Sequence, residues 1–277
     1  MALVIGLVGA SATGKSSLVE ALSLHTSISC VSCDHHYKPK DQCPVFDLSK
    51  LPWPEDYMPE AFKARGNHDL NHPAAVDWEG VVNAIDEAKR ERKKRKTEFE
   101  KVNDKDTDAT EVIVVEGLLL LADDPGAARL RENIDKYVLL SYNDDKLSRQ
   151  ALWQRKYKRS GHLSGHLSYA ERGVSEAAYE VYFEGAVESA WQRHGGEARI
   201  AKCKIGLDDS DTSCTLLRLN CHRPLRENVL ALLATGWFGT FDRQHEGLQG
   251  EEGRSKVKAI KLQRERPEAD LSSDSGT

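Results

Sequence analysis

The sequence has no apolar run long enough to cross a membrane. A spanning helix needs about 20 consecutive apolar residues, whereas the apolar stretch at the start, ALVIGLVGA (2–10), is much shorter. No basic residue precedes it, so it does not fit a secretory signal, although Ala10-Ser11-Ala12 resembles a cleavage site. We therefore expect no membrane partner, a cytoplasmic location, and a buried strand over this stretch.

Cysteine is scarce, and positive charge is not in excess. Six cysteines at irregular spacing among 277 residues do not make a disulfide framework, so reduced thiols are expected. The net charge of -5 gives no reason to expect a nucleic-acid partner. The basic run KRERKKRK (89–96) contains and adjoins acidic residues, which is typical of a solvated helix end.

What is present is an alternation of strand-like and helix-like segments. Near-continuous apolar runs predict buried strands, and apolar residues at helical spacing predict helices between them. The expected strands are 3–8, 27–32, 111–121, 137–142 and 216–219, and the expected helices are 16–24, 77–95, 143–159, 175–194 and 226–238. This order predicts an α/β fold with a parallel sheet of about five strands, covered by helices on both faces.

The segments outside this alternation are polar. Residues 35–73 are rich in proline, aspartate and asparagine and predict a long loop with one helical turn, and 101–110 predict a polar linker. From about residue 244 large apolar residues nearly disappear. We therefore expect one folded domain over 1–243 and a disordered tail over 244–277.

The strongest signal is the stretch GASATGKS (9–16), which matches the phosphate-binding pattern G-x-x-x-x-G-K-[ST]. It lies directly after a predicted buried strand and directly before a predicted helix, where backbone N–H groups and the helix dipole can surround phosphate oxygens. Lys15 would neutralise the β- and γ-phosphates of ATP, and the Ser16 hydroxyl would ligate Mg²⁺. The expected nucleotide-binding residues are Gly9, Ala10, Ser11, Ala12, Thr13, Gly14, Lys15, Ser16 and Ser17.

A phosphate-binding loop does not by itself define a reaction. A guanine-nucleotide switch would need DxxG after the third strand and NKxD further along the chain. The stretch DDPG (123–126) fits the first pattern but lies beyond the strand, and NKxD is absent. The sequence therefore favours a P-loop kinase over a GTPase switch.

Acidic and basic residues occur where a kinase needs them. Ligands of open α/β sheets bind at the carboxyl ends of the strands, where Asp34 follows the second predicted strand and Glu116 ends the third. The basic cluster QRKYKRSG (154–161) ends a helix just before the repeat GHLSGHLS (161–168), and 154–174 is expected to form a lid. A turn aspartate, a structural ion pair and a solvated helix end are the plainer alternatives for these three features.

Together these segments resemble the nicotinamide riboside kinase and uridine kinase family of small P-loop kinases. The resemblance runs from residue 3 to about residue 195 and rests on GASATGKS, VSCDHHYKP, NHPAAVD, VVEGLLL and RKYKRSGH, in this order. It implies that Asp34 is the base or orienting group for a nucleoside 5′-hydroxyl and that Glu116 helps to hold Mg²⁺ and its waters. It also implies catalytic lid cations at Arg155 and Arg159, with Lys156 and Lys158 as alternates.

The nicotinamide riboside kinase branch is the closer likeness, which implies conversion of nicotinamide riboside to its mononucleotide in NAD biosynthesis. The chain departs from the family at Leu70-Asn71, where an aromatic residue and a ribose-binding aspartate are usual, and at Tyr179-Glu180, which replaces Trp-Pro. Asparagine can hydrogen-bond a ribose diol but lacks the charge of aspartate. The implied substrate contacts are Asp34, His36, Tyr37, Asn71 and Tyr179.

Two other functions stay open, a uridine or cytidine kinase and a non-catalytic nucleotide-binding protein. The expected partner is a small nucleoside bound by a monomer or homodimer. Trp53 and Tyr57, in the loop before Asn71, would either cover an aromatic base or pack on the surface.

A metal-like pattern accompanies Asp34. It comprises Cys30-x-x-Cys33 followed by His35, His36 and Cys43, which has the residue types of a zinc site. Alternation along the second predicted strand would send Cys30 and Cys33 to opposite faces, which opposes joint ligation. We therefore expect Mg²⁺, held near Ser16 and Glu116, to be the metal of this protein.

Overall fold

The computed structural model describes residues 2–54, 58–63, 68–100, 112–143, 145–159, 167–203 and 215–238. The chain divides into a unit over 1–240 and a second over 241–277, and the described residues all belong to the first. The linker 101–110, the tail 244–277 and Tyr57, all named in the predictions, lie outside the described residues, as do residues 160–166 of the predicted lid. Among the described residues, no helix has the length and apolar character needed to span a bilayer.

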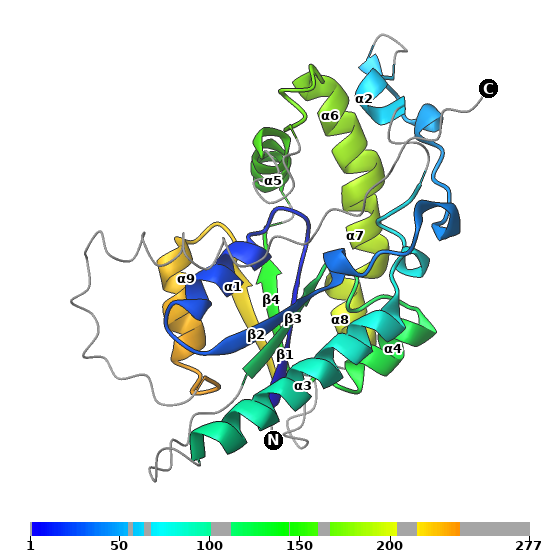
Figure 1. Cartoon of the computed structure of the whole chain (residues 1–277). Helices are drawn as coiled ribbons and strands as arrows, with labels where there is room; N and C mark the ends of the chain where they lie inside the picture. The colour runs from blue at the N-terminus through cyan, green and yellow to red at the C-terminus, as the bar shows by residue number, and fades with distance from the viewer. Residues whose placement is uncertain are drawn as a thin grey trace. The chain divides into compact units, whose positions relative to one another are not determined.

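A five-stranded parallel sheet forms the centre of the described unit, as predicted (Figure 1). Its strands are β1 (Leu3–Gly9), β2 (Ile28–Ser32), β3 (Val112–Gly117), β4 (Lys136–Ser141) and β5 (Thr215–Asn220), in the order β2-β3-β1-β4-β5. Every residue of β3 is buried, which explains why this strand is apolar on both faces. This sheet, with the phosphate-binding pattern after β1, is the P-loop NTPase fold.

The strand order places the helices on two faces. The step from β1 to β2 runs one way along the sheet, and all later steps run the other way, so right-handed crossovers put α1 opposite the later connecting helices. Accordingly, α1 packs on α9 and α3 packs on α4 (Figure 1). The helices are α1 (Lys15–Ser23), α2 (Glu60–Lys63), α3 (Trp78–Glu100), α4 (Pro125–Arg131), α5 (Lys146–Lys158), α6 (Glu176–Tyr182), α7 (Ser189–His194), α8 (Glu197–Lys202) and α9 (Leu225–Leu233).

Local capping explains where several helices begin. The side chain of Asp145 accepts a hydrogen bond from Ser148 N at the start of α5. The Asp124 side chain accepts from Gly126 N and Ala127 N, and proline occupies the first turn of α4. The DDPG stretch is therefore the N-terminal cap of a helix that the sequence pattern did not predict.

The predicted helix 175–194 is interrupted by a π-helical segment. α6 continues into Phe183–Glu188, where the hydrogen bonds are of the π type, and then into α7. π segments are rare and insert an extra residue into a helical turn. The interruption changes which residues of the continuing helix face the sheet, an effect that apolar periodicity alone does not predict.

An aromatic cluster joins α2, α5 and α6. The Phe62 ring lies 4.6 Å from that of Tyr182 and 5.4 Å from that of Tyr169, and Phe62 is completely buried. The Tyr157 hydroxyl on α5 donates to Val174 O at 2.7 Å. These contacts hold the chain that enters α6 against the end of α5, so both described ends of the predicted lid are packed.

Candidate active site

The loop between β1 and α1 contains two residues with left-handed backbone conformation and one position of close backbone packing. Gly14 has φ +93° and Ala12 has φ +67°, both in the left-handed region. Gly9 packs closely against Thr13, and an added Cβ would lie only 2.7 Å from Thr13 Oγ1. Thr13 Oγ1 donates to Ala10 O at 2.9 Å and closes the loop on itself.

The Lys15 side chain folds back onto the carbonyl groups at the start of this loop. Its Nζ donates to Gly9 O at 2.9 Å and to Ala10 O at 3.1 Å. Burial lowers the pKa of Lys15, and the carboxylates of Asp34 and Glu116 act in the opposite direction. Lys15 Nζ is thus held by two neutral carbonyl oxygens, with two carboxylates nearby. Phosphate oxygens can replace these carbonyl oxygens as its hydrogen-bond acceptors.

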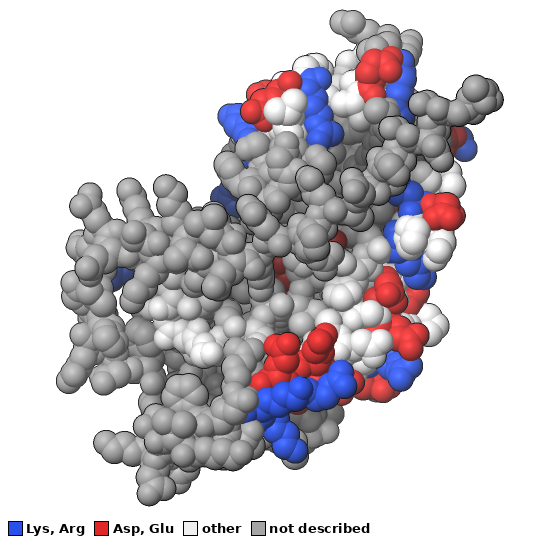
Figure 2. Space-filling model, viewed as in Figure 1, with Lys and Arg blue, Asp and Glu red and all other residues white. Residues whose placement is uncertain are grey.

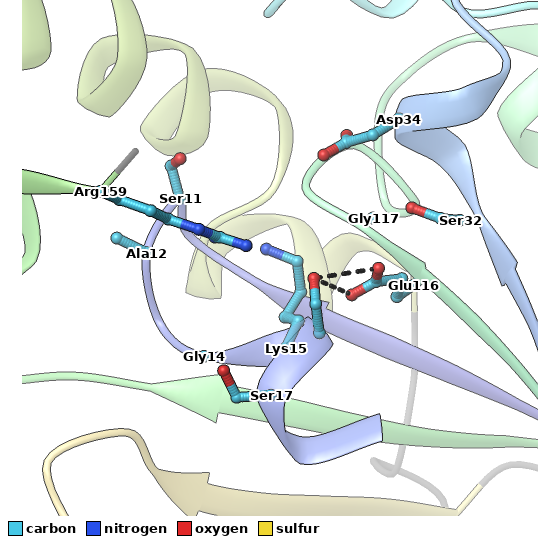
Figure 3. A pocket seen from close by; sticks show the side chains of 11 residues that line it. Ser11, Ala12, Gly14, Lys15, Ser17, Ser32, Asp34, Glu116, Gly117 and Arg159 are labelled. Atoms are coloured by element: carbon cyan, nitrogen blue, oxygen red, sulfur yellow. Dashed lines mark hydrogen bonds between the residues drawn. The ribbon is translucent and has the colours of Figure 1, made fainter. Parts of the chain in front are cut away.

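Glu116 lies beside Ser16 at the end of β3. Ser16 Oγ is 3.1 Å from both Glu116 Oε1 and Oε2, and the hydroxyl donates to the carboxylate (Figure 3). The register of the sheet sets Glu116 level with Leu7 on β1 and Ser32 on β2. The carboxyl ends of these three strands therefore bring the loop, Asp34 and Glu116 to one edge, as predicted.

Asp34 lies in a helical turn, Cys33–His35, that begins directly after β2. It is exposed, and Tyr37 Oη donates to Asp34 Oδ1 at 3.4 Å. Cys33 is buried beneath it, and burial raises the pKa of the Cys33 thiol, so this cysteine remains protonated. Cys30 is exposed, which agrees with the predicted alternation of the two cysteines along β2.

These residues surround a cavity of about 70 Å³ at the sheet edge. Lys15 and Arg159 approach it from one side, and Asp34 and Glu116 from the other (Figure 3). The volume is far below the ~300–1,000 Å³ of a whole ligand pocket, so the enclosed space suits a phosphoryl group. The lining residues are Ser11, Ala12, Gly14, Lys15, Ser16, Ser17, Ser32, Asp34, Glu116, Gly117 and Arg159.

The end of α5 reaches this cavity through two cations. Arg159 is exposed and lines it, and its charge lies close enough to lower the pKa of Lys15 further. Lys156 Nζ donates to Ser11 Oγ at 2.5 Å, which ties α5 to the phosphate-binding loop. Arg155 lies instead beside Cys221, after β5, where its charge lowers a thiol pKa that burial raises. Its predicted catalytic role stays a prediction.

The predicted substrate contacts do not all meet at this cavity. His36 lies against the start of α3, with Nδ1 3.1 Å from the position of a Cβ on Gly80. Asn71 lines a second, smaller cavity together with Tyr182 and Ala186. Tyr179 is buried in the aromatic cluster, 4.6 Å from the ring of Tyr169. Of the five predicted contacts, Asp34 alone is among the residues that line the first cavity, and Tyr37 is hydrogen-bonded to it.

Two neighbouring positions escaped the sequence-based prediction. Ser32 and Gly117 line the cavity at the ends of β2 and β3, and their places two residues before Asp34 and directly after Glu116 would have indicated them.

For Trp53 the sequence left two alternatives open, covering an aromatic base and packing on the surface. Trp53 is buried, with its ring 5.1 Å from that of Phe62 and its Nε1 donating to Leu48 O at 2.8 Å. Trp53 therefore packs inside the loop in this structure.

Comparison with known proteins adds little to this picture. No protein-family model and no curated protein matches the chain. It is similar to a solved sugar kinase from a Janibacter species, with 12% identity, coverage of 86% of this chain and 96% of the other, and a TM-score of 0.39. It is also similar to a gluconokinase from Sinorhizobium meliloti, with 14% identity, 84% and 94% coverage, and a TM-score of 0.39. These values are too low to assign a function.

Proposed function

We propose that this chain is a P-loop kinase that transfers the γ-phosphate of ATP to a hydroxyl group of a small molecule. The observation that carries the proposal is the phosphoryl-sized cavity, which two cations and two carboxylates line from opposite sides. Phosphoryl transfer depends on positioning and on charge stabilisation, and these are the groups that supply both. A structural role alone would not require Lys15 and Arg159 to face the same small space.

In the proposed reaction each side of the cavity has one task. The acceptor oxygen attacks the γ-phosphorus, the bond from phosphorus to the bridging oxygen breaks, and ADP leaves. Asp34 orients the acceptor hydroxyl or takes its proton, because it is the exposed carboxylate at the end of β2. Lys15 and Arg159 stabilise the negative charge of the transferring group.

The donor groups at the end of β3 fit Mg²⁺. Ser16 and Glu116 present a hydroxyl and a carboxylate side by side, with 3.1 Å between their oxygens. Hard oxygen donors of this kind, together with substrate phosphates and water, are what Mg²⁺ takes in kinases. Ser16 would ligate the ion and Glu116 would hold it through its waters; when bound, Mg²⁺ would neutralise charge on the phosphates.

For the acceptor, we propose a ribonucleoside 5′-hydroxyl, with nicotinamide riboside first and uridine or cytidine second. The support is the resemblance of VSCDHHYKP and NHPAAVD to segments of nucleoside kinases, together with the contact between Tyr37 and Asp34. A ribose contact by Asn71 stays a prediction, because Asn71 lines the second cavity and not the one that Asp34 lines. A non-catalytic nucleotide-binding protein is the alternative outcome of the test below.

The test measures ADP release from ATP and Mg²⁺ with a panel of acceptors. The panel contains nicotinamide riboside, uridine, cytidine, fructose and gluconate, and each phosphorylated product is identified by mass. Asp34→Asn should lower kcat by about 10²- to 10⁴-fold, the range of general acid–base catalysis, with little change in ATP affinity. Asp41→Asn, an exposed aspartate in a neighbouring turn, is the matched control and should behave as wild type.

Each result of this test has a clear meaning. ATP binding without turnover of any acceptor would contradict the kinase and favour a nucleotide-binding protein. Turnover of a sugar acid but of no nucleoside would keep the kinase and replace the acceptor. Full activity of Asp34→Asn would remove Asp34 from the mechanism.

A further inference from the structure

The segment that carries Asp34 is held by a turn distant in sequence. After β2 the chain leaves the sheet, and Lys38 N donates to Ala75 O at 2.9 Å while Lys38 Nζ donates to Ala74 O at 3.0 Å. Two backbone contacts join the same segments, a bridge between Tyr37 and Val76 and a 2.7 Å hydrogen bond from Asp77 N to His36 O. The orientation of Asp34 and Tyr37 therefore depends on the turn Pro73–Ala75.

His72 caps that turn with its side chain. Its Nδ1 accepts a hydrogen bond from Ala74 N at 3.1 Å, and its carbonyl accepts from Ala75 N at 2.9 Å. Nδ1 is thus the side-chain acceptor that satisfies the first free N–H of the turn, as an N-cap residue does for a helix.

A second histidine packs edge-on against this one. His194, the last residue of α7, has its ring centroid 5.5 Å from that of His72, with 67° between the planes. The charged groups that face His194 are Arg193, Arg199 and Asp69. Burial, then Arg193 and His72, lower the pKa of His194, and Asp69 opposes them. The ring of His194 thus lies against the capping side chain of His72.

We propose that His72 is a positioning residue for the acceptor side of the active site, and that its cap on the turn Pro73–Ala75 holds the Asp34 segment in place. This inference rests on the proposed function, which makes the placement of Asp34 matter. When the cap is lost, the hydrogen bonds that Ala74 and Ala75 accept from Lys38 loosen with it. The phosphate-binding loop keeps its own contacts, so nucleotide affinity does not depend on the cap.

The first test needs no acceptor and no turnover. Hydrogen exchange reports the protection of the Ala74 and Lys38 amides. Both amides should be protected in the wild type, because Ala74 N donates to His72 Nδ1 and Lys38 N donates to Ala75 O. Removal of the cap should lower both protection factors about tenfold, the loss expected for one hydrogen bond.

Variants separate the cap from the histidine itself. His72→Asn keeps a side-chain acceptor that can reach the amide two residues on, so protection should stay high. His72→Ala should lose this protection. His25→Asn, at an exposed histidine after α1, is the control and should keep the wild-type protection of both amides.

Kinetics then connect the cap to the site, with nicotinamide riboside and uridine as acceptor probes. In His72→Ala, KM for the acceptor should rise while KM for ATP stays level. His72→Asn, which keeps a capping acceptor, should restore the wild-type KM for the acceptor. Wild-type amide protection in His72→Ala, or the same KM for the acceptor in His72→Ala as in wild type, would overturn the proposal. If neither probe is phosphorylated, the proposed acceptor fails, and the exchange data alone decide whether His72 holds the segment.

Discussion

The phosphate-binding loop and the segment that carries Asp34 face the same cavity, but they are built differently. The loop lies between β1 and α1 and is closed by its own residues, through Thr13 to Ala10 and Lys15 to Gly9. The segment after β2 has no regular strand or long helix. Besides local contacts such as Tyr37 with Asp34, it forms hydrogen bonds with residues almost 40 positions away, as between Lys38 and Ala74. One side of the site is thus determined locally and the other by tertiary contacts.

Because of this difference, changes elsewhere in the protein should affect the geometry of the two sides to different extents. A locally closed loop keeps its geometry when its surroundings change, which suits the phosphate groups that are common to all donors. A segment held by a few distant hydrogen bonds and by packing can shift with small changes elsewhere, which suits recognition of one acceptor. The two sides should therefore respond differently to substitutions in the core, in the loop and to pH.

The largest effect is expected when the aromatic cluster that packs the long loop after the Asp34 segment is disrupted. Phe62→Ala should lower the free energy of unfolding by about 3–5 kcal/mol, because Phe62 is completely buried between Trp53 and Tyr182. Urea denaturation measures the loss, and calorimetric titration should show ATP affinity close to wild type under native conditions. Val45→Ala is the control, since Val45 is 74% exposed, and it should change stability by less than about 0.5 kcal/mol.

If Phe62→Ala weakened ATP binding as strongly as it weakened acceptor binding, the two sides would not be independent. A loss below about 1 kcal/mol would mean that the cluster refills around the missing ring. Either result would contradict the contrast between the locally closed loop and the packed segment.

A smaller effect, on activity rather than stability, is expected in the loop. Lys15→Met should lower kcat by about 10²- to 10³-fold, or about 2.7–4 kcal/mol, as for removal of one preorganised charge-stabilising donor. Stability should fall little or rise, because burial already lowers the pKa of Lys15 and so disfavours its charged form in the folded chain. Lys50→Met removes only an exposed lysine 3.4 Å from Asp47 and should change neither quantity. An equal loss of stability and activity in Lys15→Met would assign Lys15 a structural role.

The same contrast explains which features the sequence predicts. The strands and the residues at their ends follow from apolar runs and from the phosphate-binding pattern, so Lys15, Glu116 and Asp34 could be assigned to one edge. α4 could not, because its Asp124-Pro125-Gly126 start has the composition of a turn. Each of these assignments depends on a few neighbouring residues.

The acceptor side was harder to predict because its contacts are not local. Tyr179 has the spacing of a residue on one helical face, but whether that face meets a substrate or a core depends on Tyr169 and Tyr157. The cap by His72 depends on a side-chain rotamer, and its value to the site depends on Lys38. No pattern of residue types along the chain contains such pairings.

The smallest effect expected is a pH dependence of stability that originates beside the acceptor side. Burial lowers the pKa of the half-buried His36 below 6.5, with Asp77 opposing and His35 assisting. Between that lowered value and 6.5 the unfolded chain binds more protons than the folded one, so the free energy of unfolding rises with pH. His36 adds no slope to the pH dependence above or below this window.

His36→Gln should therefore flatten the rise in the urea midpoint from about pH 5.5 to pH 7.5. Part of the rise should remain because the pKa of His194 is also lowered. His25→Gln, an exposed histidine, should keep the wild-type slope, and a slope unchanged in His36→Gln would show that this side chain does not couple folding to pH.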